Sequence, residues 1–350
     1  MTKEINGYIA DLPEGCITET DIFTEAGVLL CPKMTLIDEK LLHSLRAYKG
    51  KIHVTITYMN ISTDIQAEKD ESIDFSESMK AYALENITTL CANIDNPQVI
   101  TDNVTNMSDE ISNVIHHSKS LGINLSKLKI SDEYTYKHSV DVGTIAGLIA
   151  AEMGESERFI HDITMAGILH DIGKEKIPLE IINKPGKLND VEFKIIKMHP
   201  VYGYQILSQC SDISEEIKQG VLNHHENIDS SGYPRNLNMN KIGKMGQILA
   251  IADVFDALAT ARPYKAAKTP AQSIEIMFGM MNKFNVSIFK TFLDIVTAYP
   301  NGSTVQLNGG RTGTVIRQNK SYPLRPVVQV DNDIIDLSND MRYLSTIIVE

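Results

Sequence analysis

Histidines and aspartates occur in this chain in a pattern that suits a metal site. Asp171 follows His170 directly, and Asp253 interrupts the apolar run ILAIADVFDALA. A carboxylate in an apolar helical stretch is costly unless it is paired or binds a metal. Imidazoles and carboxylates together suit iron, manganese, zinc or nickel, and a carboxylate can bridge two ions. The candidate ligands of a two-metal site are His138, His170, Asp171, His199, His224, His225 and Asp253.

The other histidines have weaker companions. A second His-Asp pair, His161-Asp162, lies nine residues before His170. Nine steps of about 100° leave half a turn, so on one continuous helix the two pairs would face opposite sides. We therefore expect His161 at the surface. Four more histidines have no acidic or cysteine companion at metal spacing and are interpreted as surface or helix residues: His43, His53, His116 and His117.

The composition favours a soluble globular protein. The 350 residues suggest two or three domains at about 100–200 residues each. The net charge of −12 argues against non-specific binding to nucleic acid polymers. The N-terminus lacks the apolar core of a signal peptide, and the longest weakly polar run, 142–151, is short of the ~20 residues of a membrane span. Four scattered cysteines without a CxxC pair exclude a disulfide scaffold and predict a cytoplasmic location.

Periodicity and turn residues divide the chain into four expected regions, and the fold class is mainly α. Residues 1–60 are expected to form a small α+β module, with strands around a turn at Gly27, a helix from Thr35 through Tyr48, and a strand over Lys51–Tyr58. Residues 61–130 are expected to be an acidic linker and spacer helices. Residues 131–299 carry apolar residues at helical spacing without a strand run. Residues 300–350 are expected to form a small β module.

Local signals mark several ends of these elements. Asn189 and Glu192 have the spacing of a capping pair, and Pro270 suits the first turn of a helix. Asn308-Gly309-Gly310 predicts a hairpin between strands over 304–307 and 313–318. Two further strands are expected over 326–330 and 334–337.

Five stretches, in order, carry a resemblance to a known family. The chain resembles the HD-GYP branch of the HD-domain metal-dependent phosphohydrolases over about 131–299, in the stretches YTYKHSVDVG, ILHDIGKEKIP, NKPGKLNDVEFKIIKMHPVYGYQIL, LNHHENIDSSGYP and ILAIADVFDALATARPYK. The resemblance implies a helical fold and a phosphodiesterase that hydrolyses cyclic di-GMP to linear pGpG by metal-hydroxide attack on phosphorus. A further cut to GMP stays open.

The resemblance also implies roles for individual residues. One metal would be bound by His138, His170, Asp171 and Asp253, and Asp171 would bridge to a second metal held by His199, His224 and His225. The ions would be divalent, with iron or manganese favoured. Asp171 and Lys174 would be catalytic, with Lys174 beside the scissile phosphate. Tyr233 would shape the substrate loop. Arg262 and Lys265 would hold phosphate oxygens, Arg262 by two parallel hydrogen bonds and Lys265 as a point charge.

The sequence departs from the family pattern in its substrate loop and before the first histidine. Asn227 replaces a basic residue, and Ser230 replaces a glycine, which restricts the loop if that position needs a positive φ. Some members have a glutamate four residues before the first metal histidine and bind a third metal. Here that position is Tyr134, and Glu133 is one step off. Two metals are therefore expected.

Two other functions remain as alternatives. A related enzyme would cleave another cyclic dinucleotide, such as a mixed GMP-AMP ring. A degenerate domain would bind the dinucleotide and signal by contact, although the complete set of candidate ligands argues against it. A purely structural protein would leave Asp253 and the five ordered motifs unexplained. The expected partner is cyclic di-GMP as substrate, without a nucleic acid polymer or a membrane span, and a homodimer is an open possibility.

Overall fold

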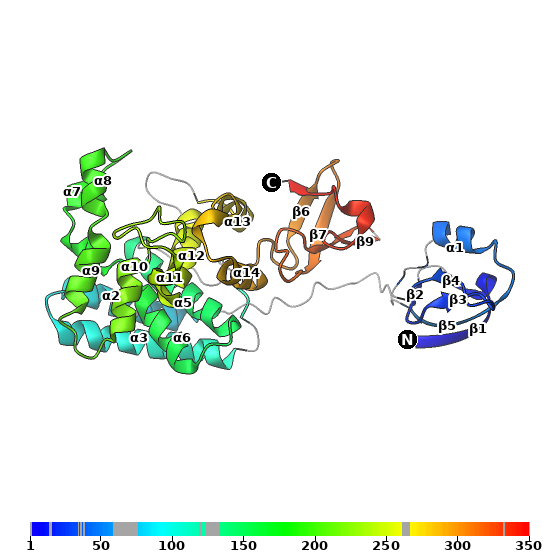
Figure 1. Cartoon of the computed structure of the whole chain (residues 1–350), viewed down its shortest axis with the longest axis horizontal. Helices are drawn as coiled ribbons and strands as arrows, with labels where there is room; N and C mark the ends of the chain where they lie inside the picture. Colours follow the sequence, from blue (N-terminus) through cyan, green and yellow to red (C-terminus); the bar gives the residue numbers. More distant parts are fainter. Residues whose placement is uncertain are drawn as a thin grey trace. The chain divides into compact units, whose positions relative to one another are not determined.

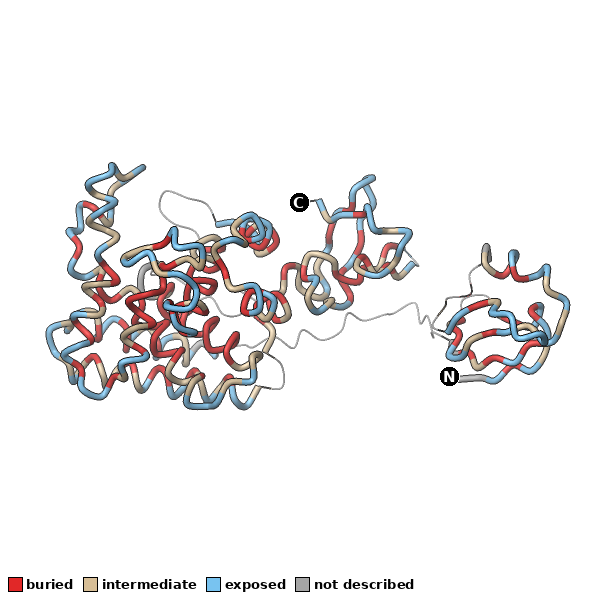
Figure 2. Tube along the Cα trace, in the orientation of Figure 1, coloured by how far each residue is buried: buried red, intermediate tan, exposed pale blue. Residues whose placement is uncertain are grey.

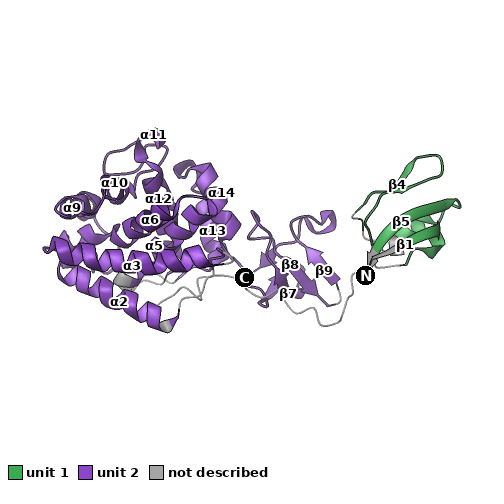
Figure 3. Cartoon of the chain, turned by 90° about the horizontal axis from the view of Figure 1, so that it is seen from below, with its two compact units in different colours: residues 1–66 green, residues 67–350 purple. Residues whose placement is uncertain are grey.

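The protein divides into two compact units, residues 1–66 and 67–350 (Figure 3). The computed structural model describes residues 2–13, 16–33, 35, 37, 39–58, 76–118, 121–123, 134–260, 267–331 and 333–349. Helices dominate the second unit and small antiparallel sheets lie near both ends of the sequence (Figure 1), so the predicted mainly α class is confirmed. None of the described helices is long and apolar enough to cross a bilayer.

The first unit is built on a three-stranded antiparallel sheet of order β1-β5-β2. Strand β5 buries alternate residues, Ile52, Val54 and Ile56, and Ile5 of β1 is the partner of Val54. The predicted strand over 51–58 and the pair around Gly27 are confirmed. The elements are β1 (Thr2–Tyr8), η1 (Ile9–Asp11), β2 (Cys16–Thr18), β3 (Ile22–Phe23), β4 (Leu29–Cys31), α1 (Glu39–Leu45) and β5 (Lys51–Tyr58).

The helix expected from Thr35 through Tyr48 is shorter than predicted. It begins at Glu39 and ends at Leu45. The backbone N–H of Thr35 donates to the hydroxyl of Thr18, and its own hydroxyl donates to the carbonyl of Pro32. The first bond ties Thr35 to β2 and the second ties its hydroxyl to the residue after β4, so Thr35 is held four positions before the helix begins. Tertiary pairing overrides the local capping signal here.

Helices of the second unit enclose one large apolar core. They are α2 (Glu77–Ala92), α3 (Pro97–His117), α5 (Tyr134–Glu152), α6 (Glu157–Leu169), η2 (Ile172–Lys176), α7 (Leu179–Ile182), α8 (Asp190–Ile196), α9 (His199–Leu207), α10 (Glu215–Asn223), α11 (Met239–Ile242), α12 (Lys244–Ala259), α13 (Pro270–Phe278), η3 (Met281–Lys283) and α14 (Val286–Ile295). Within 134–260 and 267–299 no strand occurs, as predicted.

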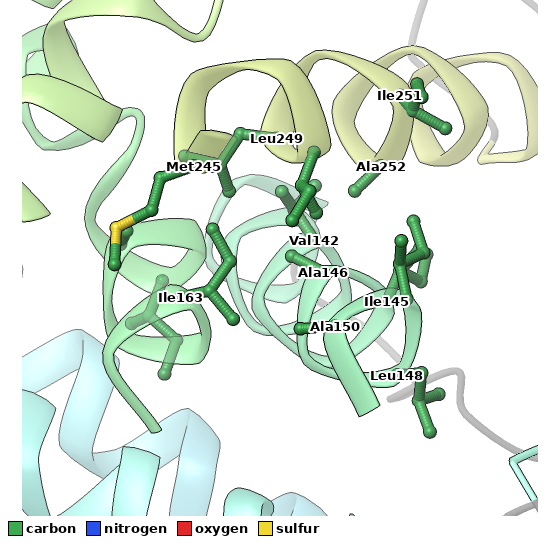
Figure 4. Packing of buried hydrophobic residues seen from close by; sticks show 14 of the residues in the cluster. Val142, Ile145, Ala146, Leu148, Ala150, Ile163, Met245, Leu249, Ile251 and Ala252 are labelled. Atoms are coloured by element: carbon green, nitrogen blue, oxygen red, sulfur yellow. The ribbon is translucent and has the colours of Figure 1, made fainter. Parts of the chain in front are cut away.

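Helix α5 lies at the centre of this core. It is buried nearly all round, which matches its almost unbroken run of small and apolar residues from Val142 to Ala150. Figure 2 shows the buried residues gathered in the middle of the helical part, and Figure 4 shows Val142 and Ala146 of α5 facing Leu249 and Ala252 of α12. The helices α2 and α3, from the segment expected to hold spacer helices, bury residues such as Ile87 and Ile111 in the same core.

Glycines permit two close crossings that bring distant ligands together. A Cβ on Gly167 of α6 would lie 2.5 Å from Cα of Gly143 on α5, so these helices touch backbone to backbone. A Cβ on Gly173 of η2 would lie 2.0 Å from the carbonyl oxygen of His199. The first crossing brings α5 against α6, and the second brings the turn after α6 against the start of α9.

The predicted helix caps and the C-terminal β module are confirmed. Asn189 and Glu192 form a capping box at the start of α8, and Pro270 is in the first turn of α13. The C-terminal strands form one antiparallel sheet of order β10-β6-β7-β8-β9, which includes the expected hairpin at 308–310. The elements are β6 (Thr304–Leu307), β7 (Thr312–Arg317), β8 (Val327–Val330), β9 (Asp333–Asp336), η4 (Met341–Tyr343) and β10 (Ile348–Val349).

Candidate metal centre

The seven candidate ligands come from five places in the helical unit and meet in one buried cluster. His138 is on α5, His170 ends α6 and Asp171 follows it at the start of η2. His199 opens α9, His224 ends α10 with His225 next, and Asp253 is on α12. The side chains of His170, His199 and His224 are at most 1% exposed.

Helix ends hold three of these histidines by the ring nitrogen that faces away from the cluster. Nδ1 of His170, His199 and His224 lies 2.7, 2.7 and 2.6 Å from the carbonyl oxygen three residues earlier. The last carbonyls of a helix lack an intrahelical donor, so the imidazole completes the helix end. A carbonyl only accepts, so Nδ1 must carry the proton and Nε2 presents its lone pair to the cluster.

Asp171 lies between two groups of histidines. Its Oδ2 is 3.2 Å from Nε2 of His170 and 3.8 Å from Nε2 of His138. Its Oδ1 is 3.3 Å from Nε2 of His199. Ligand atoms within 4.8 Å of one another form one group with His138 and His170, and a second group with His199, His224 and His225. Both groups include Asp171.

Asp253 also faces two sides of the cluster. Its Oδ1 is 3.1 Å from Nε2 of His138 and 3.9 Å from Nε2 of His170, whereas its Oδ2 is 3.6 Å from Nδ1 of His225. It forms a third such group with His170 and His224. Asp253 therefore, like Asp171, lies close to histidines of both groups.

The donor set fits a cation. Nε2 of His199 and Nε2 of His224 lie 3.2 Å apart. Both rings carry their proton on Nδ1, so neither Nε2 can donate a hydrogen bond to the other. Nε2 of His170 and Oδ1 of Asp171 are buried without a hydrogen-bond partner. Lone pairs facing lone pairs in a buried space repel one another, and a divalent ion converts that repulsion into coordination.

The electrostatics of the cluster point the same way. Burial lowers the pKa of His199 to about 3 and that of His225 to about 4, so both rings are neutral at neutral pH, which is the form that binds metals. Burial acts to raise the pKa of Asp171, but attraction to the His170 ring in its protonated form and to the ammonium of Lys174 outweighs it and holds that pKa well below its usual range. Asp171 is thus an ionised carboxylate close to the neutral ring of His199. At His138, burial acts to lower the pKa, but hydrogen bonds to Asp253 and Asp256 outweigh it and raise that pKa to about 10.

Asp256 orients His138, and it was not among the site residues predicted from the sequence. The side chain is fully buried, and its Oδ2 lies 2.6 Å from Nδ1 of His138. Its Oδ1 accepts from the hydroxyl of Thr260 at 3.0 Å. This carboxylate fixes the proton on Nδ1, so Nε2 of His138 faces Asp253 and Asp171. The available signal was its position three residues after Asp253 on the same helix face.

Glu226 organises the loop that carries Tyr233, and it too was missed. It is 1% exposed, and its two oxygens accept from the backbone N–H groups of Arg235 at 2.6 Å and Leu237 at 2.9 Å. The backbone N–H of Tyr233 donates to the carbonyl of His225 at 3.1 Å. The Tyr233 ring lies over the ring of His225, with centroids 4.6 Å apart. The loop is therefore attached directly to the cluster.

The two loop departures have defined places. Ser230 has a φ of 65°, so the position does need the left-handed conformation that a glycine adopts freely. The side-chain amide of Asn227 donates to the hydroxyl of Ser231 at 2.9 Å, which keeps it within the loop.

Of the remaining residues named from the sequence, one lies at the cluster, one lies away from it, and the others are outside the described part of the chain. The ammonium group of Lys174 donates to Oδ2 of Asp171, so it lies at the cluster. His161 contacts Asp109 of α3 and its neighbour Asp162, away from the cluster, and is partly buried. Arg262, Lys265 and Glu133 lie outside the described residues, as does the side chain of Tyr134.

Comparisons with known proteins identify the family. The family model for the HD domain matches residues 111–288, about half of the chain. The chain therefore belongs to the HD domain family, in agreement with the resemblance predicted from its motifs. A solved structure of an HDG"Y"P protein from Bdellovibrio bacteriovorus has the same fold, with a TM-score of 0.51, 16% identity, and coverage of 84% of this chain and 99% of that one.

Curated relatives include phosphodiesterases for cyclic dinucleotides. A Pseudomonas aeruginosa protein named as a cyclic di-GMP phosphodiesterase is 38% identical over 231 residues, 66% of this chain and 56% of the relative. The Vibrio cholerae 3'3'-cGAMP-specific phosphodiesterase 3 is 38% identical over 144 residues, 41% of this chain and 31% of the relative. The chain thus spans about half, or less, of the length of these relatives.

Proposed function

We propose that this protein is a phosphodiesterase that hydrolyses cyclic di-GMP to linear pGpG with two divalent metal ions. The observation that carries the proposal is the convergence of buried imidazole nitrogens on the two carboxylates Asp171 and Asp253. The relative from Pseudomonas aeruginosa, which is named as a cyclic di-GMP phosphodiesterase, supports the choice of substrate.

The proposed ligand sets follow the groups around Asp171. One ion would be held by His138, His170, Asp171 and Asp253, and the other by Asp171, His199, His224 and His225. When bound, such a pair of ions lowers the pKa of a shared water and neutralises charge on both the attacking and the leaving oxygen. Iron and manganese both suit this mixture of imidazole and carboxylate ligands.

The chain's own groups would bind the phosphodiester and assist its cleavage. Lys174 is 31% exposed at its side chain, and its ammonium lies at Asp171, where it can neutralise the scissile phosphate or protonate the departing 3′ oxygen. Tyr233 would form the wall of the substrate site over His225. Arg262 and Lys265 are proposed to hold phosphate oxygens, Arg262 with its bidentate fork. In-line attack on phosphorus then breaks the P–O3′ bond.

Another cyclic dinucleotide is the second candidate substrate. The Vibrio cholerae relative named as specific for 3'3'-cGAMP has the same identity to this chain, 38%, as the cyclic di-GMP relative, although over fewer residues. The metal cluster recognises the phosphodiester, which both rings share. Base selection therefore depends on residues away from the cluster.

The wider organisation is also a proposal. We propose that the chain is organised as regions 1–60, 61–130, 131–299 and 300–350, and that the third region is catalytic. Both a monomer and a homodimer are compatible with this proposal. The buried free thiols of Cys16, Cys31 and Cys210 agree with the proposed reducing, cytoplasmic location.

Metal analysis combined with a turnover assay tests the proposed function. The full chain is prepared without oxygen, its iron and manganese are counted, and pGpG release from cyclic di-GMP is followed. We expect turnover in the parent, and loss of at least one metal and of essentially all hydrolysis in Asp171→Ala. Binding of cyclic di-GMP without turnover, under both metals, would instead establish a receptor. Turnover that persists in Asp171→Ala would refute the bridging role of Asp171.

A further inference from the structure

A cationic and aromatic surface lies beside the metal cluster, at the end of α8. The ammonium of Lys197 is 4.6 Å from the ring centroid of Phe193 and 5.5 Å from that of Tyr233. The Tyr233 ring in turn lies 4.6 Å from the ring of His225. These contacts form a continuous path from α8 to a candidate metal ligand, so Lys197 lies within one side-chain length of the substrate loop.

Among the described residues, Lys197 has no acidic partner, unlike Lys174 and Lys184. It differs from the equally unpaired Lys194 in lying over the rings of Phe193 and Tyr233. Lys174 is bound to Asp171, and Lys184 lies 2.7 Å from Glu192. Within the described part of the chain, the contacts of the Lys197 ammonium are to aromatic rings, and no carboxylate pairs with it. Its positive charge is therefore available to an anionic ligand, in a protein whose net charge is −12.

Phe193 adds an exposed aromatic face to this charge. Phe193 is 45% exposed, so this aromatic residue is open to solvent rather than buried in the core. Aromatic rings are good platforms for nucleic acid bases, because each base has a π face that stacks on them. A phosphate on Lys197 and a base on Phe193 would together match one half of a dinucleotide.

We propose that Phe193 and Lys197 form a subsite for the half of the cyclic dinucleotide that is not being cleaved. This inference rests on the proposed function. When one phosphodiester lies at the metal cluster, the second phosphate and its nucleoside must extend beyond it. The end of α8 offers the unpaired cation and the exposed ring in contact with the substrate loop. The subsite supplies binding energy to a substrate long enough to reach it.

Substitutions on α8 with a matched control test this subsite. Lys197→Gln removes the charge, Lys197→Arg keeps it, and Lys194→Gln removes an exposed charge one turn earlier on the same helix. Loss of a charge-assisted contact should raise the KM and the Kd for cyclic di-GMP about tenfold in Lys197→Gln. Lys197→Arg should restore most of the binding, Phe193→Ala should weaken it, and Lys194→Gln should match the parent.

A substrate with a single phosphodiester distinguishes the contribution of the subsite from that of the metal cluster. Bis(p-nitrophenyl) phosphate has one phosphodiester and no second phosphate, so its KM should change less than that of cyclic di-GMP in Lys197→Gln. An equal loss for both substrates, or a Lys197→Gln protein that behaves like Lys194→Gln, would overturn the subsite while leaving the phosphodiesterase proposal intact. If the parent protein binds cyclic di-GMP without turnover, the dissociation constants of the parent and the variants for cyclic di-GMP replace the KM values in this test. A parent that neither binds nor cleaves cyclic di-GMP would overturn both proposals.

Discussion

Asp256 provides a sharp test of how the cluster is held together. Asp256→Asn removes the negative charge but keeps the shape of the side chain and an oxygen that can accept a hydrogen bond. In the native protein the carboxylate bonds the Nδ1 proton of His138 at 2.6 Å, and both side chains are almost completely buried. The substitution therefore perturbs one histidine of the cluster without deleting a ligand.

The expected loss follows from that single bond. A hydrogen bond to a charged group contributes about 1.5–3 kcal/mol, which corresponds to roughly 10- to 100-fold in an equilibrium constant. Partners of metal-bound histidines have effects of about the same size on metal affinity. Because Asp256 contacts only His138 among the candidate ligands, we expect the loss to fall mainly on the ion bound by His138.

The assay is competition for iron or manganese with a chelator of known affinity, with bound metal counted at each step. Asp162→Asn is the matched control, because Asp162 also bonds a histidine, at 3.0 Å from Nδ1 of His161, but outside the cluster. We expect the control to retain the parent's affinities. Thermal unfolding of the metal-free variants shows whether Asp256→Asn changes the fold itself. If both ions stay bound as tightly as in the parent, the orienting role of Asp256 is refuted.

Three further predictions concern the loop and the crossing helices. Glu226→Gln leaves one of the two backbone N–H groups, of Arg235 or Leu237, without an acceptor, at a cost of about 1–3 kcal/mol. It should raise the KM for the dinucleotide and leave the metal content unchanged; unchanged kinetics would contradict the role of Glu226 in holding the loop. Gly173→Ala places a Cβ 2.0 Å from the carbonyl oxygen of His199 and should lower metal content, whereas Gly279→Ala, with its nearest contact at 3.2 Å, should not. Ser230→Gly relieves a left-handed serine and should stabilise the fold by up to about 1 kcal/mol, which denaturant unfolding measures; a destabilised variant would show that the serine is not strained.

Local signals in the sequence were enough for many of the elements. Hydrophobic spacing located the helices around His138 and His170, and the caps at Asn189 and Pro270 marked true helix starts. Such signals work because capping and amphipathic spacing act between residues a few positions apart. The helix expected from Thr35 shows their limit, because a hydrogen bond to Thr18 decides that residue's conformation.

The sequence by itself determined which donor atoms are available and that the chain belongs with HD-domain proteins. It did so because the types and order of His and Asp residues in five motifs are properties of the chain alone. Only the tertiary structure decided how these atoms meet. His138 and Asp256 are separated by 118 positions, and their contact depends on how α5 packs against α12. The tertiary structure also decided that Glu226 accepts two backbone hydrogen bonds of the Tyr233 loop and that His161 lies outside the cluster. Burial and acceptor geometry arise only when distant segments come into contact.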